Sequence, residues 1–456
     1  MSAIPNDLQL HPGRSGPVRR NAARASSLLF GAFAVAVIIR FAVPGNVLNL
    51  FEQYSSFNQI NSSGSIVGKI HPGSYGIIAI TIVMLPRILA KWTKDYDGVM
   101  NSLFIMAAAI VVVSVICVFT GQTASIGYMV DSMLVACAAG ACALCFSAPQ
   151  RRSLGISLLV ITIISSAIAI MEFAAKTHFL PQEVMASEGA TSIRADGLFV
   201  HPLDLGLYSA VAIPILSLTG WSHWIKAAIT SILILGIFAA GARVAAIAAI
   251  TMVVFGLLFT KRSRIEMGSL ILEKTVVIAG LLLLIPIMWF AASSLGLTER
   301  FQQEGLTDDS AMARIIIFQV FGFMEWSDLI WGVGNLEMYK FAALGLNIDS
   351  VENSLIVYVF QFGLIGAFLI VGSMARTALA LARDTQFPLK MALLAFFMIA
   401  ITNNTLSVKS PSLLFIIILA IAFRRSAAAE RANFSRPRPS RDGFRPMPAQ
   451  VRPPAE

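Results

Sequence analysis

The sequence predicts an all-α protein: a polytopic transmembrane helical bundle of about twelve spans, with a large, partly helical loop between spans 9 and 10. Two observations predict this class. Of the 456 residues, 57% are hydrophobic and only 13% are charged, which is more apolar than a soluble chain of this length can bury. Apolar runs of about 20 residues, the length that a helix needs to cross a bilayer, also recur along the chain.

The apolar runs divide the chain into three parts. We expect a basic cytoplasmic tail at 1–26, a membrane domain at 27–424 and a disordered cytoplasmic tail, rich in Arg and Pro, at 425–456. The first run is interpreted as a retained helix rather than a cleaved signal, and the long stretch before Lys261 is divided at Ala239-Ala-Gly-Ala-Arg243. The predicted spans are 27–44, 76–92, 101–120, 127–147, 153–174, 203–220, 223–239, 241–260, 274–292, 353–375, 387–404 and 410–424.

The basic residues predict the orientation of the bundle. With the N-terminus inside, the Lys and Arg clusters fall on the cytoplasmic side at almost every loop, as the positive-inside rule requires. The long connections at about 45–75, 175–202 and 293–352 then lie on the opposite face. The last of these is acidic and rich in Trp and Phe, which predicts short helices lying on the membrane. The basic residues in question are Lys91, Lys94, Arg151, Arg152, Lys226, Lys261, Arg262, Arg264, Arg376, Arg383 and those of the tail from Arg424.

Composition also excludes several classes of protein. The four cysteines all lie inside apolar runs, so neither a disulfide framework nor a zinc site is expected. The formal net charge of +9 is explained by orientation and by contact of the tail with anionic lipid, so no nucleic-acid partner is expected. No second His, Cys or carboxylate accompanies His201 at metal-ligand spacing, and we predict neither a metal site nor a cofactor.

Two arginines on the outer face are candidates for phosphate binding. Arg243 opens an apolar span, where a buried arginine costs about 2–3 kcal/mol and is usually paired or functional. The alternative is that it extends to the headgroups and anchors the helix. Arg314 follows a helix start at Asp309 or Ser310 in the large acidic loop, where a salt bridge is the alternative. The planar guanidinium donates two parallel hydrogen bonds to phosphate oxygens and stays charged, so an arginine is well suited to bind a lipid diphosphate.

A carboxylate on the same face can supply a base. Glu352 stands at the start of a span with Asp349 three residues before it, which resembles a capping box. In the other interpretation, the ionised Glu352 accepts a proton from an incoming hydroxyl. Arg194 and His201 share the segment that enters another span, where His-Pro is also an ordinary helix start.

These pieces, in this order and on one face, resemble the O-antigen ligase and polymerase-like membrane proteins of bacterial polysaccharide assembly. The likeness covers about 190–370. Its pieces are Arg194-x-x-Gly197-x-x-x-His201-Pro202, Gly-Ala-Arg243, Ser310-Ala-Met-Ala-Arg314, Trp331-Gly-Val-Gly334, Glu352-Asn353 and Gly363-Leu-Ile-Gly366.

The resemblance implies a glycosyltransferase of the bacterial inner membrane that uses neither a metal nor a nucleotide sugar. Both termini would be cytoplasmic, and the active face, with the large loop, would be periplasmic. The donor would be a glycan on undecaprenyl diphosphate, held by Arg243 and Arg314. Glu352 would activate the hydroxyl of an acceptor glycan, which displaces the lipid diphosphate with inversion. Arg194, His201 and Asn353 are weaker candidates for substrate contacts.

The resemblance leaves the exact activity open. Ligases of this family commonly show His-Asn where this chain has Glu352-Asn353. We therefore favour polymerisation of exopolysaccharide or O-antigen repeats over ligation of glycan to lipid A core. A chain-length regulator and export proteins are then expected partners, beside the lipid bilayer. Two alternatives of other classes are a transporter or flippase of lipid-linked glycan and a non-catalytic scaffold of an export complex.

Overall fold

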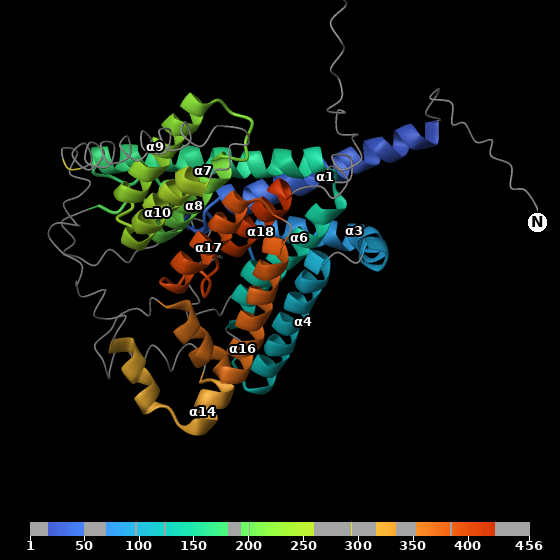
Figure 1. Cartoon of the computed structure of the whole chain (residues 1–456). Coiled ribbons are helices and arrows are strands. Elements are labelled where there is room, and N and C mark those ends of the chain that lie inside the picture. Colours follow the sequence, from blue (N-terminus) through green and yellow to red (C-terminus); the bar gives the residue numbers. More distant parts are fainter. Residues whose placement is uncertain are drawn as a thin grey trace, which may run out of the picture.

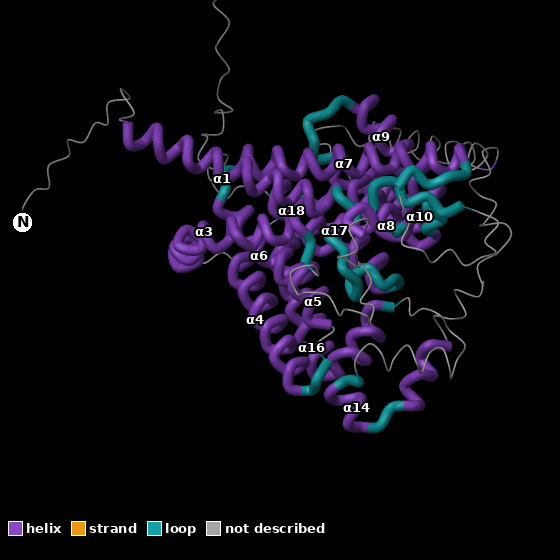
Figure 2. The backbone as a smooth tube through the Cα atoms, turned by 180° about the vertical axis from the view of Figure 1, so that it is seen from behind, coloured by secondary structure: helices purple, strands orange, loops and turns teal. Residues whose placement is uncertain are grey.

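A computed structural model describes residues 17–49, 70–95, 98–122, 125–180, 193–199, 201–259, 293, 316–333, 353–383 and 385–424. In this part of the chain every regular element is a helix (Figures 1 and 2), so the predicted all-α class is confirmed. Three predictions lie outside the described residues: the span at 274–292, Arg314 and Glu352. The tail at 425–456 also lies outside them.

Within the described residues, six helical stretches are long and apolar enough to cross a membrane. The helix α4, with 22 residues, rises about 33 Å, close to the thickness of a hydrocarbon core. The first helix begins at Pro17, inside the predicted tail at 1–26, because proline suits the first turn of a helix; its apolar window begins only at Ala25. The six are α1 (Pro17–Ala42), α3 (Pro72–Asp95), α4 (Gly98–Phe119), the continuous stretch α5 (Ile126–Tyr128), η3 (Met129–Leu134) and α6 (Val135–Cys145), α7 (Ala148–Ala175) and α16 (Ser354–Arg383).

Five further apolar helices in the described part of the chain are shorter than a span, so the predicted total of about twelve spans is not confirmed. The twelve residues of α18 rise only about 18 Å. The non-helical residues 402–411, which precede α18, are mostly buried. The shorter helices are α8 (Pro202–Leu216), α9 (His223–Ala239), α10 (Arg243–Phe259), α17 (Phe387–Ile401) and α18 (Ser412–Phe423).

The short helix α18 lies at the centre of the bundle, against α6 and α7 (Figure 1). All twelve of its residues are buried. Close approach depends on small residues on the neighbouring helices, since a Cβ added at Gly155 would lie 2.6 Å from the Cβ of Ala422. Such small-residue contacts are the usual means by which apolar helices associate in a membrane.

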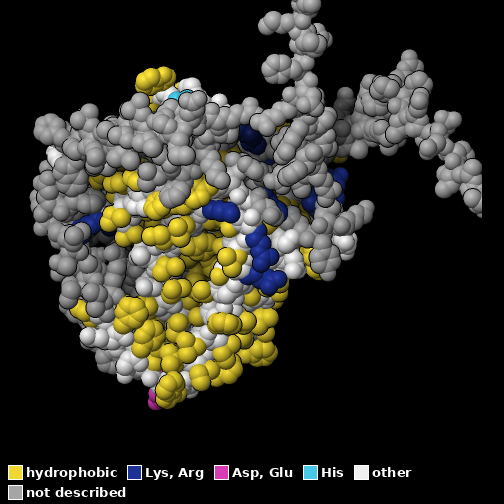
Figure 3. All heavy atoms as spheres, viewed as in Figure 1, with side chains coloured by type: hydrophobic (Ala, Val, Ile, Leu, Met, Phe, Trp, Pro, Cys, Tyr) yellow, Lys and Arg dark blue, Asp and Glu magenta, His cyan; other side chains and the backbone are white. Residues whose placement is uncertain are grey.

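Two contacts join helix ends that the charge pattern predicts to lie on the same, cytoplasmic face of the membrane. Lys91 Nζ donates to the Leu144 carbonyl at 2.6 Å, and Arg152 donates to the Leu218 carbonyl at 3.0 Å. All four residues belong to ends predicted to be cytoplasmic. The helices α4 and α16 lie side by side and antiparallel in both ribbon views (Figures 1 and 2). Their surface is largely apolar, with Lys and Arg on its upper side and acidic side chains at the α14 end (Figure 3).

The large loop contributes two short helices that dock on a bend in α16. These are η4 (Ile317–Phe323) and α14 (Trp326–Trp331), so the expectation of short helices in this loop is confirmed for its described part. The bend lies at Gly363, whose φ of +66° and ψ of 177° only glycine adopts readily. A Cβ at Gly363 would lie 2.0 Å from the Ile330 carbonyl oxygen, and one at Gly332 would lie 2.6 Å from the Gly363 nitrogen. Two motif pieces of the resemblance, around Trp331 and Gly363, are therefore in direct contact.

Candidate functional site

A buried ion pair lies where the end of α1 meets η3. Arg40 Nη2 lies 3.2 Å from Asp131 Oδ2, and the two side chains are 4% and 0% exposed. The other carboxylate oxygen of Asp131 accepts a hydrogen bond from the backbone N–H of His71 at 3.0 Å. Asp131 lies on a π-helical turn, a distortion that is frequent at functional sites.

His71 links this ion pair to the start of α3. Its Nδ1 accepts from Gly73 N at 3.0 Å, so Nε2 carries the proton and donates to the Val43 carbonyl, also at 3.0 Å. The pKa of His71 is lowered to about 4, chiefly by burial and then by the charge of Arg40, while Asp131 opposes both effects. The imidazole is therefore neutral at physiological pH and caps the helix.

The connection between α17 and α18, residues 402–411, is polar and mostly buried. Thr405 Oγ1 donates to Asp204 Oδ1 at 3.0 Å, and the Tyr208 hydroxyl lies 2.7 Å from Ser412 Oγ. Asp204 also interacts electrostatically with Arg40. We call the set Arg40, His71, Asp131, Asp204 and Thr405 the buried polar cluster; it joins α1, α3, η3 and α8 to the connection.

The start of α16 is held by the same connection. Asn353 Oδ1 accepts from Leu355 N at 3.0 Å and from Ile356 N at 3.2 Å, so Asn353 is the helix cap. Ser354 donates to the Asn403 carbonyl through both its N–H, at 3.0 Å, and its hydroxyl, at 2.8 Å. The residue that follows Glu352 is thus fixed beside the buried polar cluster.

The segment 193–199 lies against the turn between α9 and α10. Ala195 N donates to the Ala239 carbonyl at 3.1 Å, and Arg194 Nε donates to the Ala240 carbonyl at 3.4 Å. The next residue, Gly241, has a φ of +62° and leads into α10, which begins at the partly buried Arg243. The structure therefore brings the predicted residues Arg194 and Arg243 to one end of the bundle.

His201 is the N-cap of α8, where its Nδ1 accepts from Leu203 N at 3.1 Å. The helix-start interpretation of His-Pro is therefore correct, whatever else His201 contacts. The same helix packs tightly on α10, since a Cβ at Gly206 would lie 2.5 Å from the Cβ of Ala242. The starts of α8 and α10 therefore lie close together, and Asp204 of α8 binds the same connection that holds Ser354 at the start of α16.

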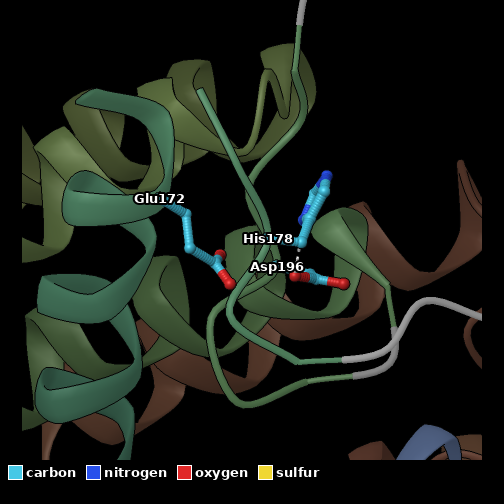
Figure 4. A group of neighbouring side chains, drawn as sticks. All are labelled: Glu172, His178 and Asp196. Atoms are coloured by element: carbon cyan, nitrogen blue, oxygen red, sulfur yellow. Dashed lines mark hydrogen bonds and ion pairs between the residues drawn. The ribbon is translucent and has the colours of Figure 1, made fainter. Parts of the chain in front are cut away.

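Three further ionisable residues gather at the end of α7 (Figure 4). Glu172 points from α7 toward the segment that carries Asp196, where its Oε2 accepts from Gly197 N at 2.8 Å. Its Oε1 accepts from Phe179 N at 2.9 Å. His178 Nδ1 lies 3.3 Å from Asp196 Oδ1. One ligand atom from each of Glu172, His178 and Asp196, which we call the Glu172 group, lies within 4.8 Å of the others.

Sequence reasoning overlooked most of these buried charges. Arg40, Asp131 and Glu172 all lie inside predicted spans, and Asp204 lies inside another, where an ionisable residue is a functional candidate by itself. Within the Glu172 group only Glu172 carries this signal, because residues 172, 178 and 196 follow no metal-ligand spacing and only the fold brings them together.

The comparisons with known proteins add no family to these observations. No family model matches the chain, and no curated protein sequence matches it. The class that the fold supports is an all-helical protein with helices long and apolar enough to span a membrane. Any proposal for its activity must therefore be argued from the candidate site.

Proposed function

We propose that this protein is a membrane glycosyltransferase that polymerises polysaccharide repeat units from a polyprenyl-diphosphate-linked glycan at the periplasmic face of the bacterial inner membrane. The observation that carries this proposal is a set of hydrogen bonds that link the segments of the candidate residues. The segment of Arg194 binds the turn before Arg243, and α8, which begins after His201, binds the connection that holds Ser354. These are the chain positions at which the resembling family keeps its substrate groups.

In this proposal, different residues bind the diphosphate charge and accept the proton. Arg243, at the start of α10, binds the diphosphate of the donor together with Arg314, because guanidinium groups stabilise charge that grows on a leaving diphosphate. Glu352 accepts the proton of the acceptor hydroxyl as that oxygen attacks the anomeric carbon. Since Asn353 already supplies the cap of α16, helix capping offers no separate reason for a carboxylate at 352.

The decisive experiment is glycan transfer by the purified protein in nanodiscs, supplied with lipid-diphosphate-linked repeat units and EDTA. Wild type is compared with Glu352→Gln and with the matched control Glu325→Gln, an exposed carboxylate of the same loop. We expect the product to lengthen with wild type and with the control, and transfer by Glu352→Gln to fall by about a hundredfold or more. Equal transfer by Glu352→Gln and wild type would exclude Glu352 as the base.

The acceptor separates two versions of this function. A polymerase extends a second lipid-linked repeat, whereas a ligase transfers the glycan to lipid A core. Supplying both acceptors in one reaction and measuring which product forms distinguishes them. We expect extension of the lipid-linked repeat, and transfer to lipid A core alone would make the protein a ligase.

One specific observation favours a second candidate function, a transporter or flippase of lipid-linked glycan. Ionisable residues such as Arg40, Asp131 and Asp204 are buried among apolar helices, and short helices meet non-helical chain, both of which are common in transporters. Proteoliposomes that move lipid-linked glycan across the bilayer without lengthening it, equally with wild type and Glu352→Gln, would favour this candidate. Transfer without movement would favour the glycosyltransferase. Neither transfer nor movement of glycan, with wild type or with any variant, would leave the export scaffold.

A further inference from the structure

We propose that the Glu172 group is a binding site for a first-row divalent metal ion, ligated by Glu172, His178 and Asp196. The three ligand atoms come from different parts of the chain: the last turn of α7, the turn that follows it and the segment 193–199. They lie within 4.8 Å of one another. A metal bonded at about 2.1 Å to each atom draws such ligands to about 3–4 Å apart, so a small inward movement of His178, the most exposed of the three, completes the site.

Charge is the first argument for a cation. Glu172 is 0% exposed and Asp196 is 3% exposed, and placing two carboxylates together in a poorly solvated site is costly without a compensating charge. Among the described residues, Glu172 forms no ion pair, and the nearest lysine in sequence, Lys176, lies with Nζ 4.2 Å from the Phe173 ring centroid. The stretch 181–192 contains no Lys or Arg. A divalent ion bound here would compensate the charge of Glu172.

Coordination chemistry selects the kind of metal. One imidazole nitrogen and two carboxylate oxygens suit Zn²⁺ or Mn²⁺, whereas Mg²⁺ and Ca²⁺ prefer oxygen ligands alone. Each oxygen of Glu172 accepts one backbone N–H and retains a second lone pair for a metal. These two amide bonds also orient the carboxylate, as outer hydrogen bonds do at known metal sites.

The proposed metal is a structural clamp outside the transfer chemistry. It would tie the end of α7 to 193–199, the segment that carries Arg194 and binds the turn before Arg243. Glu172 holds Phe179 and Gly197 by its amide bonds even without a metal, so the metal-free protein keeps its fold and the metal adds stability. The site does not rest on the proposed glycosyltransferase activity.

The test measures metal binding and thermal unfolding of the full chain, purified through a tag that contains no histidine. Chelator-treated protein in nanodiscs is titrated with ZnCl2 and MnCl2, with MgCl2 for comparison. Bound metal is counted after equilibrium dialysis. We expect one Zn²⁺ or Mn²⁺ per chain and a higher midpoint of unfolding with either ion, since a ligand that binds only the folded state stabilises it. Mg²⁺ is expected to have a weaker effect.

Variants locate the site. His178→Gln and Asp196→Asn are expected to weaken binding by about tenfold or more and to remove the thermal shift. The matched controls His223→Gln and Glu325→Gln change an exposed histidine and an exposed carboxylate elsewhere, and both are expected to bind as wild type does. Should Asp196→Asn fail to fold, His178→Gln decides the question. Absence of stoichiometric binding, or binding that His178→Gln leaves intact, would overturn the proposal, and neither result bears on glycan transfer.

Discussion

Arg40 and Asp131 form an ion pair at 3.2 Å in the apolar interior, where 4% and 0% of the two side chains are exposed. The pair connects α1 to the π-helical turn before α6, and Asp131 also binds the backbone of His71. A buried pair of this kind stabilises little relative to apolar packing, but removal of one partner leaves the other charge uncompensated.

We therefore predict that Arg40→Met destabilises the protein by about 3–5 kcal/mol. The double variant Arg40→Met with Asp131→Asn keeps an acceptor for His71 N and removes both charges, so it is expected to recover at least half of the loss. Midpoints of thermal unfolding in nanodiscs measure both effects. Additive losses in the double variant would contradict the coupling of the two residues.

The pKa of His71 predicts a pH dependence of stability. Burial lowers the pKa of His71 from 6.5 to about 4, so the unfolded state takes up a proton first as the pH falls. Stability is then complete above pH 6.5 and declines as the pH falls toward 4, by about 3 kcal/mol in total.

The measurement is the unfolding midpoint between pH 7.5 and 5, where most carboxylates stay ionised. His71→Asn is the control, because an asparagine can still accept from Gly73 N at the helix start and does not titrate. The decline should be shallower in this variant. A wild-type midpoint that stays constant across the range would show that His71 is not buried as a neutral group.

Because of the bend in α16, we predict that replacing two glycines of this helix by alanine changes the stability of the protein in opposite directions. Gly363→Ala would place a Cβ 2.0 Å from the Ile330 carbonyl oxygen at a φ of +66°, and we expect a loss of at least about 2 kcal/mol. Gly372→Ala meets nothing within 4 Å and is expected to stabilise α16 by up to about 1 kcal/mol. Chemical denaturation in detergent compares the two, and equal effects would contradict the docking of α14 on the bend.

Two neighbouring residues at the start of α16 are expected to have different roles: Asn353 stabilises the helix, and Glu352 is the proposed base. Asn353→Ala removes the side-chain acceptor of two N–H groups and is expected to cost about 1 kcal/mol. Glu352→Gln is expected to leave the unfolding midpoint unchanged while transfer is lost. Thermal unfolding and glycan transfer on the same preparations test this, and a destabilised Glu352→Gln would assign that residue a structural role.

Several motif residues were predictable because their constraint is local. Four of the glycines in the resemblance pieces or beside them, Gly197, Gly241, Gly332 and Gly363, have positive φ, a conformation that other residues avoid. His201 and Asn353 cap helices for an equally local reason, since the side chain reaches only the next two or three N–H groups. Neither role depends on distant parts of the chain.

The sequence by itself determined the helical class with apolar helices long enough to span a membrane, and it predicts the sidedness of the helix ends, because hydropathy and charge are sums over neighbouring residues. The tertiary structure alone decided which of the apolar helices are too short to span, and that residues 402–411 are buried rather than exposed. It also decided that Arg40 meets Asp131 and that Glu172 lies beside Asp196. These pairs join residues distant in sequence, and their energy comes from the exclusion of water by packed helices, which no local pattern records.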